Sequence, residues 1–174
     1  RRLTYGLADT VTANSQVALI YLEKYVSRHK LAFVPNPVTH APTDTDELPR
    51  QPIILMVARF NRQKAHDIML EAFSLISKEV PDWQLELIGT GELEQDLRQQ
   101  AEQLGISSRV VWTGQVSDTF AHYRRASIFA LPSRYEGTPN ALMEAMSTGL
   151  PSITTDTSPG ALVFVDDGVT GLVI

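Results

Sequence analysis

The chain has 174 residues, 43% of them hydrophobic, which is enough for one full domain with a core and a small additional piece. Its formal net charge is −5 and it has no long run of one sign, which argues against nucleic-acid binding, because that function favours basic faces. The absence of cysteine excludes disulfides and thiolate metal sites, and no apolar run reaches the roughly 20 residues that span a bilayer. The chain starts with Arg1, shows no signal peptide and ends on an apolar run, so we expect a piece of a longer protein.

The first part of the chain divides into a short mixed segment and a polar seam. Residues 1–37 are too few to bury a core alone. Residues 38–52 are polar and rich in proline, which is typical of a linker. Within the mixed segment we predict short strands at residues 11–13 and 31–34. Between them we predict a helix that is capped by Asn14 or Ser15 and extends to about residue 27.

From residue 53 the chain alternates between apolar runs and segments of helical spacing. The run at 53–58 is continuously apolar, as in a strand that is covered on both faces. Such alternation predicts right-handed crossovers and a parallel sheet, hence an open, doubly wound, Rossmann-like α/β domain. The predicted strands are 53–58, 83–88, 109–112, 127–131, 152–154 and 171–174, and the predicted helices are 65–79, 92–104, 118–126 and 139–148.

The most informative part of the chain is the junction that follows the fourth of these strands. Residues 136–144 open as a tight turn and become a helix. Thr138 is a suitable N-cap, and Pro139 suits the first helical position, where its missing N–H costs nothing. The unpaired N–H groups of such a helix end attract anions.

Two carboxylates border this helix end. Glu136 lies just outside it, and Glu144 lies on the same helical stripe as Asn140. Carboxylates repel phosphate, so they suit a ligand that carries hydroxyl groups beside its phosphates. A nucleotide sugar fits, with the diphosphate at the helix end, one Glu on a sugar hydroxyl pair and the other on a ribose diol. The alternative is that both are ordinary solvated residues, because Glu is common in first helical turns.

The strand order predicts which loops meet. Open parallel sheets bind ligands at the carboxyl ends of their strands, where the strand order reverses. In the common order 3-2-1-4-5-6, the reversal makes the loops after strands one and four neighbours. These loops are residues 59–64, with three cations, and 133–139, with Glu136. Together they would form a cationic phosphate cradle bordered by hydroxyl acceptors.

Three other positions follow strands two and three. Gly89 and Gly91 would let the backbone approach a ligand, although a plain turn with an unusual dihedral angle is the alternative. They do not form the dinucleotide fingerprint, which follows the first strand, so NAD binding is disfavoured. Val116 ends a turn that could shape a base pocket or be only a turn.

The histidines, an arginine pair and the two tryptophans are considered as further site residues. His66 could touch phosphate or be solvated in an early helical turn, and the other histidines lack ligand spacing, so we expect no metal site. Arg124 and Arg125 are interpreted as a solvated helix end, and the two tryptophans, Trp83 and Trp112, as core residues.

Six motifs in order resemble one family. The chain is similar to the C-terminal, donor-binding domain of a retaining family-4 glycosyltransferase (glycosyl transferases group 1) with the two-domain B-type fold. The resemblance is strong over 53–174, while residues 1–37 resemble the end of the acceptor domain. The motifs are Val57–Phe60 with Lys64, Leu87–Gly91, Val111–Gly114, Leu131–Ser133, Glu136–Met146 and Gly149–Pro151.

The resemblance implies a role for each site residue. Arg59 and Lys64 match the cations that hold the donor diphosphate, and Glu136 matches the acid that contacts the transferred sugar. The backbone from Gly137 to Asn140 lies against sugar and phosphate, and Glu144 binds the ribose diol. No metal or other cofactor is implied, because the cations and the helix end neutralise the leaving diphosphate.

The resemblance also implies partners. The donor is a UDP- or GDP-linked sugar, and the acceptor is a glycan or lipid-linked molecule read by the missing N-terminal domain. We expect a cytoplasmic protein, with peripheral association with the inner face of the membrane as a further expectation. Because that domain and the terminal helices of the donor domain are absent, we expect weak donor binding and little transfer by the chain alone.

Two positions depart from the family pattern, and two other functions stay open. Ala65 stands where the family often has Gly, and Val163 stands where it often has Glu, a change that alters donor choice or only local packing. The alternative functions are a sugar-nucleotide epimerase of the same architecture and a non-catalytic module that binds nucleotide sugars.

Overall fold

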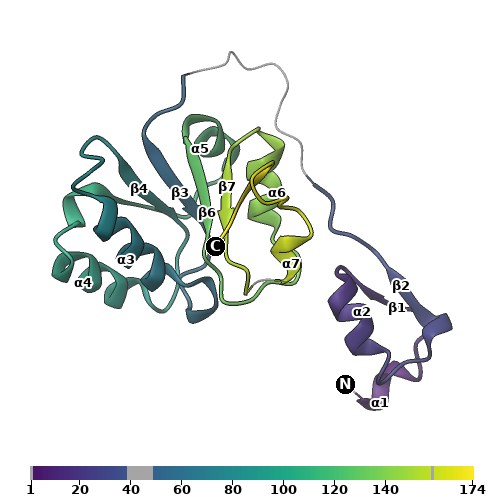
Figure 1. Cartoon of the computed structure of the whole chain (residues 1–174). Helices are drawn as coiled ribbons and strands as arrows, with labels where there is room; N and C mark the ends of the chain where they lie inside the picture. Colours follow the sequence, from purple (N-terminus) through teal and green to yellow (C-terminus); the bar gives the residue numbers. More distant parts are fainter. Residues whose placement is uncertain (1, 39–48, 158) are drawn as a thin grey trace.

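The computed structural model describes residues 2–38, 49–157 and 159–174, which form two units (Figure 1). The N-terminal unit comprises residues 2–38, and the α/β unit comprises the described residues from 49 onward. Most of the predicted linker, residues 39–48, lies outside the described residues. Within the described residues, no helix is both long and apolar enough to cross a bilayer.

The N-terminal unit is a parallel strand pair with a helix between its strands. Ser15 caps the helix by accepting a hydrogen bond from the backbone N–H of Ala18 at 3.2 Å. The helix ends at Leu22, earlier than the sequence predicts. Among the side chains of this unit that the structure describes, Val26 alone is buried, as expected for a two-stranded fragment. The elements are α1 (Arg2–Tyr5), β1 (Val11–Ala13), α2 (Gln16–Leu22), η1 (Arg28–Lys30) and β2 (Leu31–Phe33).

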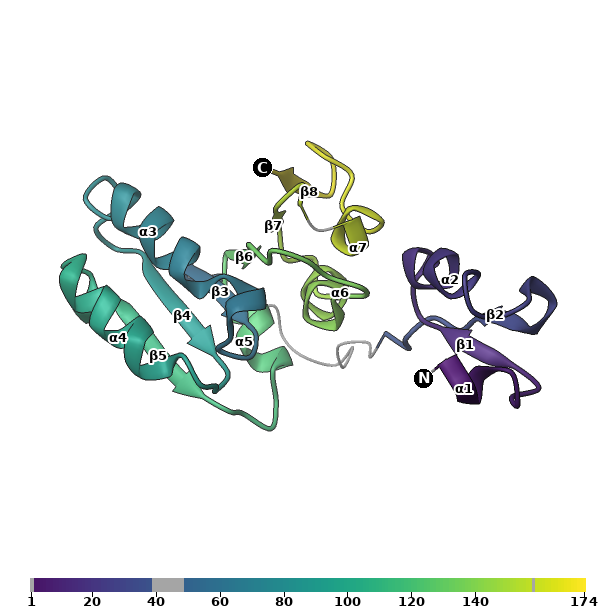
Figure 2. The same ribbon diagram turned by 90° about the horizontal axis from the view of Figure 1, so that it is seen from below.

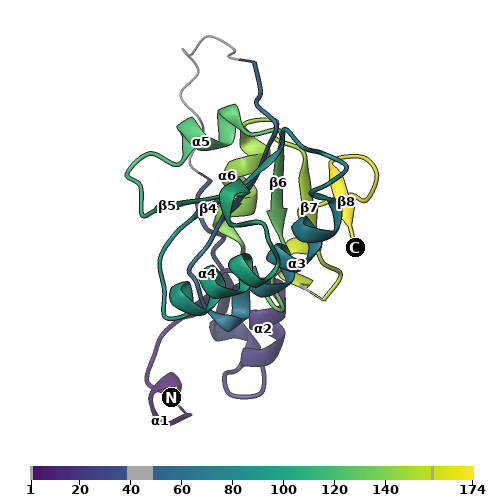
Figure 3. The same cartoon turned by 90° about the vertical axis from the view of Figure 1, so that its left-hand side faces the viewer.

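The α/β unit contains one sheet in which the six strands pair in parallel, in the order β5-β4-β3-β6-β7-β8. In Figure 3 the labelled strands of the sheet run from β5 on the left to β8 on the right. Counted along the unit, the order is 3-2-1-4-5-6, so the predicted reversal between the first and fourth strands is confirmed. The strands are β3 (Ile53–Val57), β4 (Gln84–Ile88), β5 (Val110–Gly114), β6 (Ile128–Leu131), β7 (Ser152–Thr154) and β8 (Gly171–Val173).

Helices cover both faces of the sheet (Figure 2). Crossovers in opposite directions from β3 place the helices on opposite faces. One core packs the sheet against α3 (His66–Ile76) and α4 (Glu94–Gln103), and the predicted core residues Trp83 and Trp112 border it. The other core packs it against α5 (Phe120–Arg125), α6 (Asn140–Ser147) and α7 (Pro159–Leu162). The helix α7 and the short helices η2 (Arg62–Lys64) and η3 (Ser107–Arg109) were not predicted.

A buried carboxylate on the central part of β4 corrects one sequence interpretation. Glu86 accepts hydrogen bonds from Arg125 at 2.6 Å and from Thr113 at 2.8 Å, and its Oε1 lies 2.9 Å from Nδ1 of His122. Arg125 is therefore not a solvated helix end, because its guanidinium group compensates a buried charge. Removing one partner of such a buried pair leaves an uncompensated charge, so these contacts hold α5 in place on the sheet.

Candidate functional site

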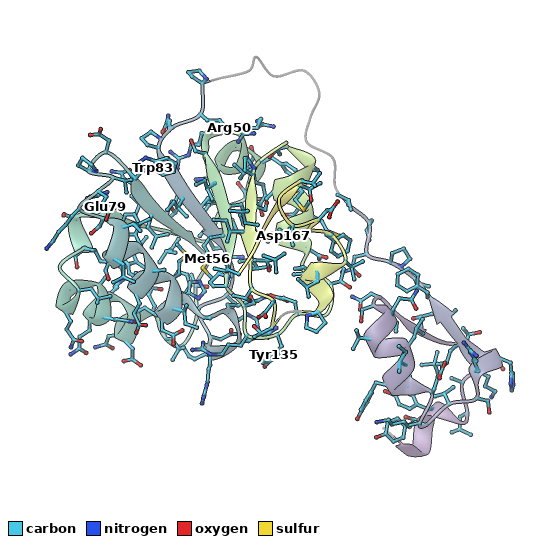
Figure 4. The ribbon with its side chains drawn as sticks, in the orientation of Figure 1. Arg50, Met56, Glu79, Trp83, Tyr135 and Asp167 are labelled. Atoms are coloured by element: carbon cyan, nitrogen blue, oxygen red, sulfur yellow. The ribbon has the colours of Figure 1, made fainter. Side chains whose placement is uncertain are left out.

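The loops after β3 and β6 meet at the carboxyl edge of the sheet. We call residues 59–65 the β3 loop and residues 133–139 the β6 loop. Tyr135, labelled in Figure 4, belongs to the β6 loop and marks this edge, and its backbone oxygen accepts a hydrogen bond from Nε2 of Gln63 at 2.9 Å. The convergence on which the predicted phosphate cradle depends is therefore present.

An ion pair joins the two loops. Nζ of Lys64 donates to Oε1 of Glu136 at 2.5 Å, and their side chains are 22% and 5% exposed. The ammonium group of Lys64 has three hydrogens, so two remain for other acceptors. The contact places the predicted phosphate cation directly beside the predicted sugar acid.

A second connection between the loops depends on Arg134. Its guanidinium group binds both carboxylate oxygens of Asp67, at 3.0 and 2.7 Å, and donates to the backbone oxygen of Arg62 at 2.8 Å. Its backbone N–H donates to the oxygen of Gln63 at 2.9 Å. The hydrogen bond from Arg134 holds the pKa of Asp67 below its usual value. Such two-point pairs fix geometry as well as charge, so Arg134 acts as a clamp on the β3 loop.

Arg59 lies on the same edge but makes no comparable contact. Its side chain is exposed, and within the described residues it has no side-chain hydrogen bond or ion pair. An exposed guanidinium group that follows the carboxyl end of β3 is suited to bind an anion, because its planar fork matches a phosphate.

The helix at the end of the β6 loop begins one residue later than the sequence predicts. Pro139 is the N-cap of α6, with φ −80° and ψ 92°, and Asn140 is the first helical residue. The prediction of Thr138 as the cap is therefore wrong, and its hydroxyl group instead donates to the backbone oxygen of Asn14 at 2.6 Å. The first hydrogen bonds of α6 start at Leu142, so the N–H groups that precede it are available to a ligand.

Glu144 is held by a buried tyrosine. The hydroxyl group of Tyr123 donates to Oε2 of Glu144 at 3.0 Å. Burial, followed by the charge of Glu144, raises the pKa of Tyr123, so this hydroxyl group stays a donor. One carboxylate oxygen is thereby fixed, and the other remains for a ligand hydroxyl group. Sequence reasoning did not identify Tyr123, because only the fold brings α5 beside α6.

Comparison with known proteins identifies the family. Residues 41–174 match the family described as Glycosyl transferases group 1. The chain belongs to this family. The expectations of the family and of the doubly wound α/β fold are both confirmed.

Two similar proteins illustrate the range of the family. An uncharacterized glycosyltransferase of Haemophilus influenzae is 31% identical over 156 residues, which cover 90% of this chain and 44% of that protein. An alpha-1,4-N-acetyl-D-galactosaminyltransferase of Campylobacter jejuni, named for a saccharide on PP-undecaprenol, is 25% identical over 175 residues, covering 100% and 48%. The chain thus spans about half the length of the curated relatives it matches.

A solved structure supports the fold. The pneumococcal O-GlcNAc transferase GtfA, in complex with UDP and GlcNAc, superposes with a TM-score of 0.85 at 24% identity. The likeness covers 99% of this chain and 35% of that one. At this identity the comparison shows a shared fold and does not transfer any residue role.

The glycines after β4 have a clear packing role in this family member. A Cβ atom on Gly89 would lie 2.1 Å from the backbone oxygen of Ala58, and one on Gly91 would lie 2.3 Å from that of Phe60. Gly89 also has a φ of +139°, the unusual dihedral angle of the alternative interpretation. The glycines let the loop after β4 pack closely on the start of the β3 loop. Their contact with a donor stays a prediction, as does that of Val116, which is partly buried against a core cluster.

His66 is not a solvated residue. Its side chain is 1% exposed, and its ring packs edge-on against Phe60 with centroids 4.7 Å apart. Burial lowers the pKa of His66 to about 4, with Lys64 contributing in the same direction and Asp67 opposing. Within the described residues neither ring nitrogen has a hydrogen-bond partner. The imidazole is therefore neutral at pH 7 and supplies no positive charge for a phosphate.

Three further positions that the sequence singles out are Gly137, Val163 and Ala65. Gly137 is exposed, and a Cβ atom on it would meet no described atom within 4 Å, so no contact within the described part of the chain requires glycine there. Val163, where the resemblance predicts Glu, is 73% exposed, so a local packing change does not explain it. Ala65 has a φ of 57°, a left-handed conformation that suits the glycine common in the family. The described residues hold no cluster of three or more His, Asp or Glu side chains placed to bind a metal ion.

Proposed function

We propose that the intact protein transfers a sugar from a nucleoside diphosphate to a glycan or lipid-linked acceptor, with retention at the anomeric carbon. This chain carries the donor site and by itself binds the donor weakly and transfers little. The observation that carries the proposal is the contact of Lys64 with Glu136 beside the start of α6, in a chain of this family. It brings a phosphate-binding cation and a hydroxyl-binding acid within one donor length of each other.

The proposed roles follow from charge. Arg59, Lys64 and the first N–H groups of α6 hold the diphosphate, Glu136 accepts from a hydroxyl group of the transferred sugar, and Glu144 accepts from the ribose diol. As the bond between the anomeric carbon and the diphosphate oxygen breaks, negative charge grows on the leaving group. Donors and cations that are already placed stabilise that charge in the transition state.

The proposal includes no resident metal or other cofactor. In this proposal Arg59, Lys64 and the start of α6 supply the positive charge that a metal ion supplies elsewhere. The donor base is uracil or guanine in this proposal, and we place the protein in the cytoplasm, at the inner face of the membrane. The lipid-linked saccharide in the name of the Campylobacter jejuni relative supports that placement.

The decisive experiment screens the intact protein against UDP- and GDP-linked sugars. We expect one donor to give a glycosylated acceptor whose anomeric configuration, read by NMR, matches that of the donor. Formation of an epimerised nucleotide sugar without any acceptor would contradict the proposal and favour an epimerase. Amide shifts that appear on titration with UDP or GDP away from the β3 loop, the β6 loop and α6 would contradict the site.

Arg59→Ala should weaken binding of the preferred nucleoside diphosphate by about 10- to 150-fold, because a charge-assisted contact is worth about 1.5–3 kcal/mol. The side chain is exposed and unpaired, so its loss should leave the fold intact. Isothermal titration calorimetry on the intact protein measures the change. Lys78→Ala, which removes an exposed cation from a distant helix end, is the matched control. Equal affinity of the two variants would remove Arg59 from the site.

Glu144→Ala should weaken donor binding by about 1–3 kcal/mol, the usual cost of losing a charged acceptor. The change also leaves the hydroxyl group of buried Tyr123 without its partner. Glu144→Ala with Tyr123→Phe is therefore the stability control, and it should recover the melting temperature but not the affinity. Calorimetry with the 2′,3′-dideoxy nucleotide separates loss of the diol contact from loss of stability. Because this nucleotide lacks the diol, Glu144→Ala should not change its affinity. An equal loss with both nucleotides would show that Glu144 does not bind the diol.

A further inference from the structure

Three asparagine side chains form a chain across the boundary between the two units. Nδ2 of Asn14 donates to Oδ1 of Asn36 at 3.0 Å, and Nδ2 of Asn36 donates to Oδ1 of Asn140 at 2.7 Å. Asn14 follows β1 and Asn36 follows β2, whereas Asn140 is the first residue of α6. Figures 1 and 2 both show the N-terminal unit on the side of the α/β unit that carries α6 and α7.

A second bond joins the same segments. The hydroxyl group of Thr138 donates to the backbone oxygen of Asn14 at 2.6 Å. Asn14 thus contacts the β6 loop through its own carbonyl group and, through Asn36, the first residue of α6. The end of the β6 loop, where the diphosphate is proposed to lie, is therefore held from outside the α/β unit.

The asparagine chain has a direction. A carboxamide has one oxygen that only accepts and one NH₂ group that only donates. Asn36 accepts from Asn14 with its oxygen, so it must offer its NH₂ group to Asn140. Asn140 therefore uses its oxygen in this contact, and within the described residues its own NH₂ group has no partner. The NH₂ group of Asn140 carries partial positive charge and can donate to an anion at the start of α6. In the reversed orientation the amide oxygen would face the anion and repel it.

We propose that Asn14 and Asn36 are positioning residues for the diphosphate end of the site, because they orient the amide of Asn140 as a hydrogen-bond donor. The inference rests on the proposed donor site. It extends that site to the N-terminal unit and explains how two residues that need not touch the ligand set its affinity. The bonds are exposed, so each adds little to folding stability, and in this proposal their effect is on ligand binding.

The test uses the intact protein and two variants of Asn36. Asn36→Asp offers only acceptor oxygens, so Asn140 must turn its NH₂ group toward Asp and its oxygen toward the anion. Asn36→Leu removes both the donor and the acceptor of the residue 36 side chain, so the amide of Asn140 can present either its NH₂ group or its oxygen to the anion. We expect UDP or GDP, whichever the wild type binds, to bind about tenfold more weakly to Asn36→Asp and about threefold more weakly to Asn36→Leu.

Charge and folding need separate controls. Thr12→Asp adds the same charge to the N-terminal unit at an exposed position of β1 outside the asparagine chain, and it should bind like the wild type. The free nucleoside, uridine or guanosine, lacks the diphosphate and should bind equally to all variants. The NMR signals of the Asn140 side-chain NH₂ group, assigned by their loss in Asn140→Asp, should shift with UDP or GDP in the wild type and not in Asn36→Asp. A merely structural contact would not produce that difference.

The outcomes separate this inference from the proposed function. If the wild type binds UDP or GDP, Arg59→Ala weakens binding and both Asn36 variants bind like Thr12→Asp, the inference is overturned and the proposed function stands. If the wild type binds neither nucleotide, the proposed function is overturned and the inference with it. Weaker binding of Asn36→Asp than of Asn36→Leu, with Thr12→Asp unchanged, supports the orientation argument.

Discussion

Replacement of Lys64 by Met should lower kcat/KM for sugar transfer by the intact protein about 100- to 1,000-fold. In the proposed site the ammonium group stabilises the charge that grows on the leaving diphosphate, and removal of one such group from a preorganised site costs about that factor. The contact with Glu136 adds to the loss, because the remaining carboxylate is 5% exposed and would have no partner for its charge. Steady-state kinetics with the preferred donor at varied concentration measures the effect.

Two matched variants isolate the cause of that loss. Lys78→Met removes an exposed lysine of the same unit and should leave kcat/KM unchanged. Lys64→Met combined with Glu136→Gln removes the stranded charge, so it should recover the melting temperature without recovering activity. A double variant that regained transfer would show that Lys64 only neutralises Glu136 and does not act on the donor.

His66 should make the fold lose stability in mild acid. Its pKa is about 4 in the folded chain and about 6.5 in the unfolded chain. Above pH 6.5 both states are neutral, so the free energy of unfolding is at its full value. Between pH 6.5 and 4 only the unfolded state binds the proton, and the free energy of unfolding should fall by about 3 kcal/mol, because each pKa unit is worth about 1.4 kcal/mol. Below pH 4 both states are protonated and the loss stops growing.

Urea unfolding of the wild type and of His66→Leu at several pH values measures this difference. Leucine keeps an apolar contact with Phe60, so the variant should lack the loss assigned to His66 while keeping the titration of carboxylates such as Asp67. His29→Gln, which changes an exposed histidine, should follow the wild-type curve. Parallel curves for the wild type and His66→Leu across pH 4 to 6.5 would show that the folded state protonates His66 readily.

The sequence was sufficient to predict the sheet and the meeting of its two loops. Strand positions followed from runs such as Ile53–Val57, and the strand order was taken to be the common order of doubly wound sheets, which the structure has. Because that order makes the β3 and β6 loops neighbours, the contact of Lys64 with Glu136 could be anticipated from residues far apart in the sequence.

The details that sequence reasoning missed depend on packing. The loop sequence around Arg134 contains no pattern that predicts a role for it. Its clamp requires Asp67, which comes within reach only because of the position of α3 in the fold. Thr138 matched the statistics of a helix cap, but a tertiary bond to the N-terminal unit takes its hydroxyl group. Neither interpretation of His66, phosphate contact or a solvated position, anticipated its burial, and Arg125 was interpreted as solvated. Their positions in the helices do not reveal which face meets the sheet. An acid and a cation far apart in the sequence are too common a combination to predict that the two side chains pair.

The clamp formed by Arg134 has a kinetic consequence. With the β3 and β6 loops already joined through Asp67, Arg62 and Gln63, their conformational freedom is lost when the chain folds and not when a ligand arrives. A nucleotide that reaches this edge should therefore associate at a rate limited by diffusion and steering. The rate should fall as added salt screens the exposed cations.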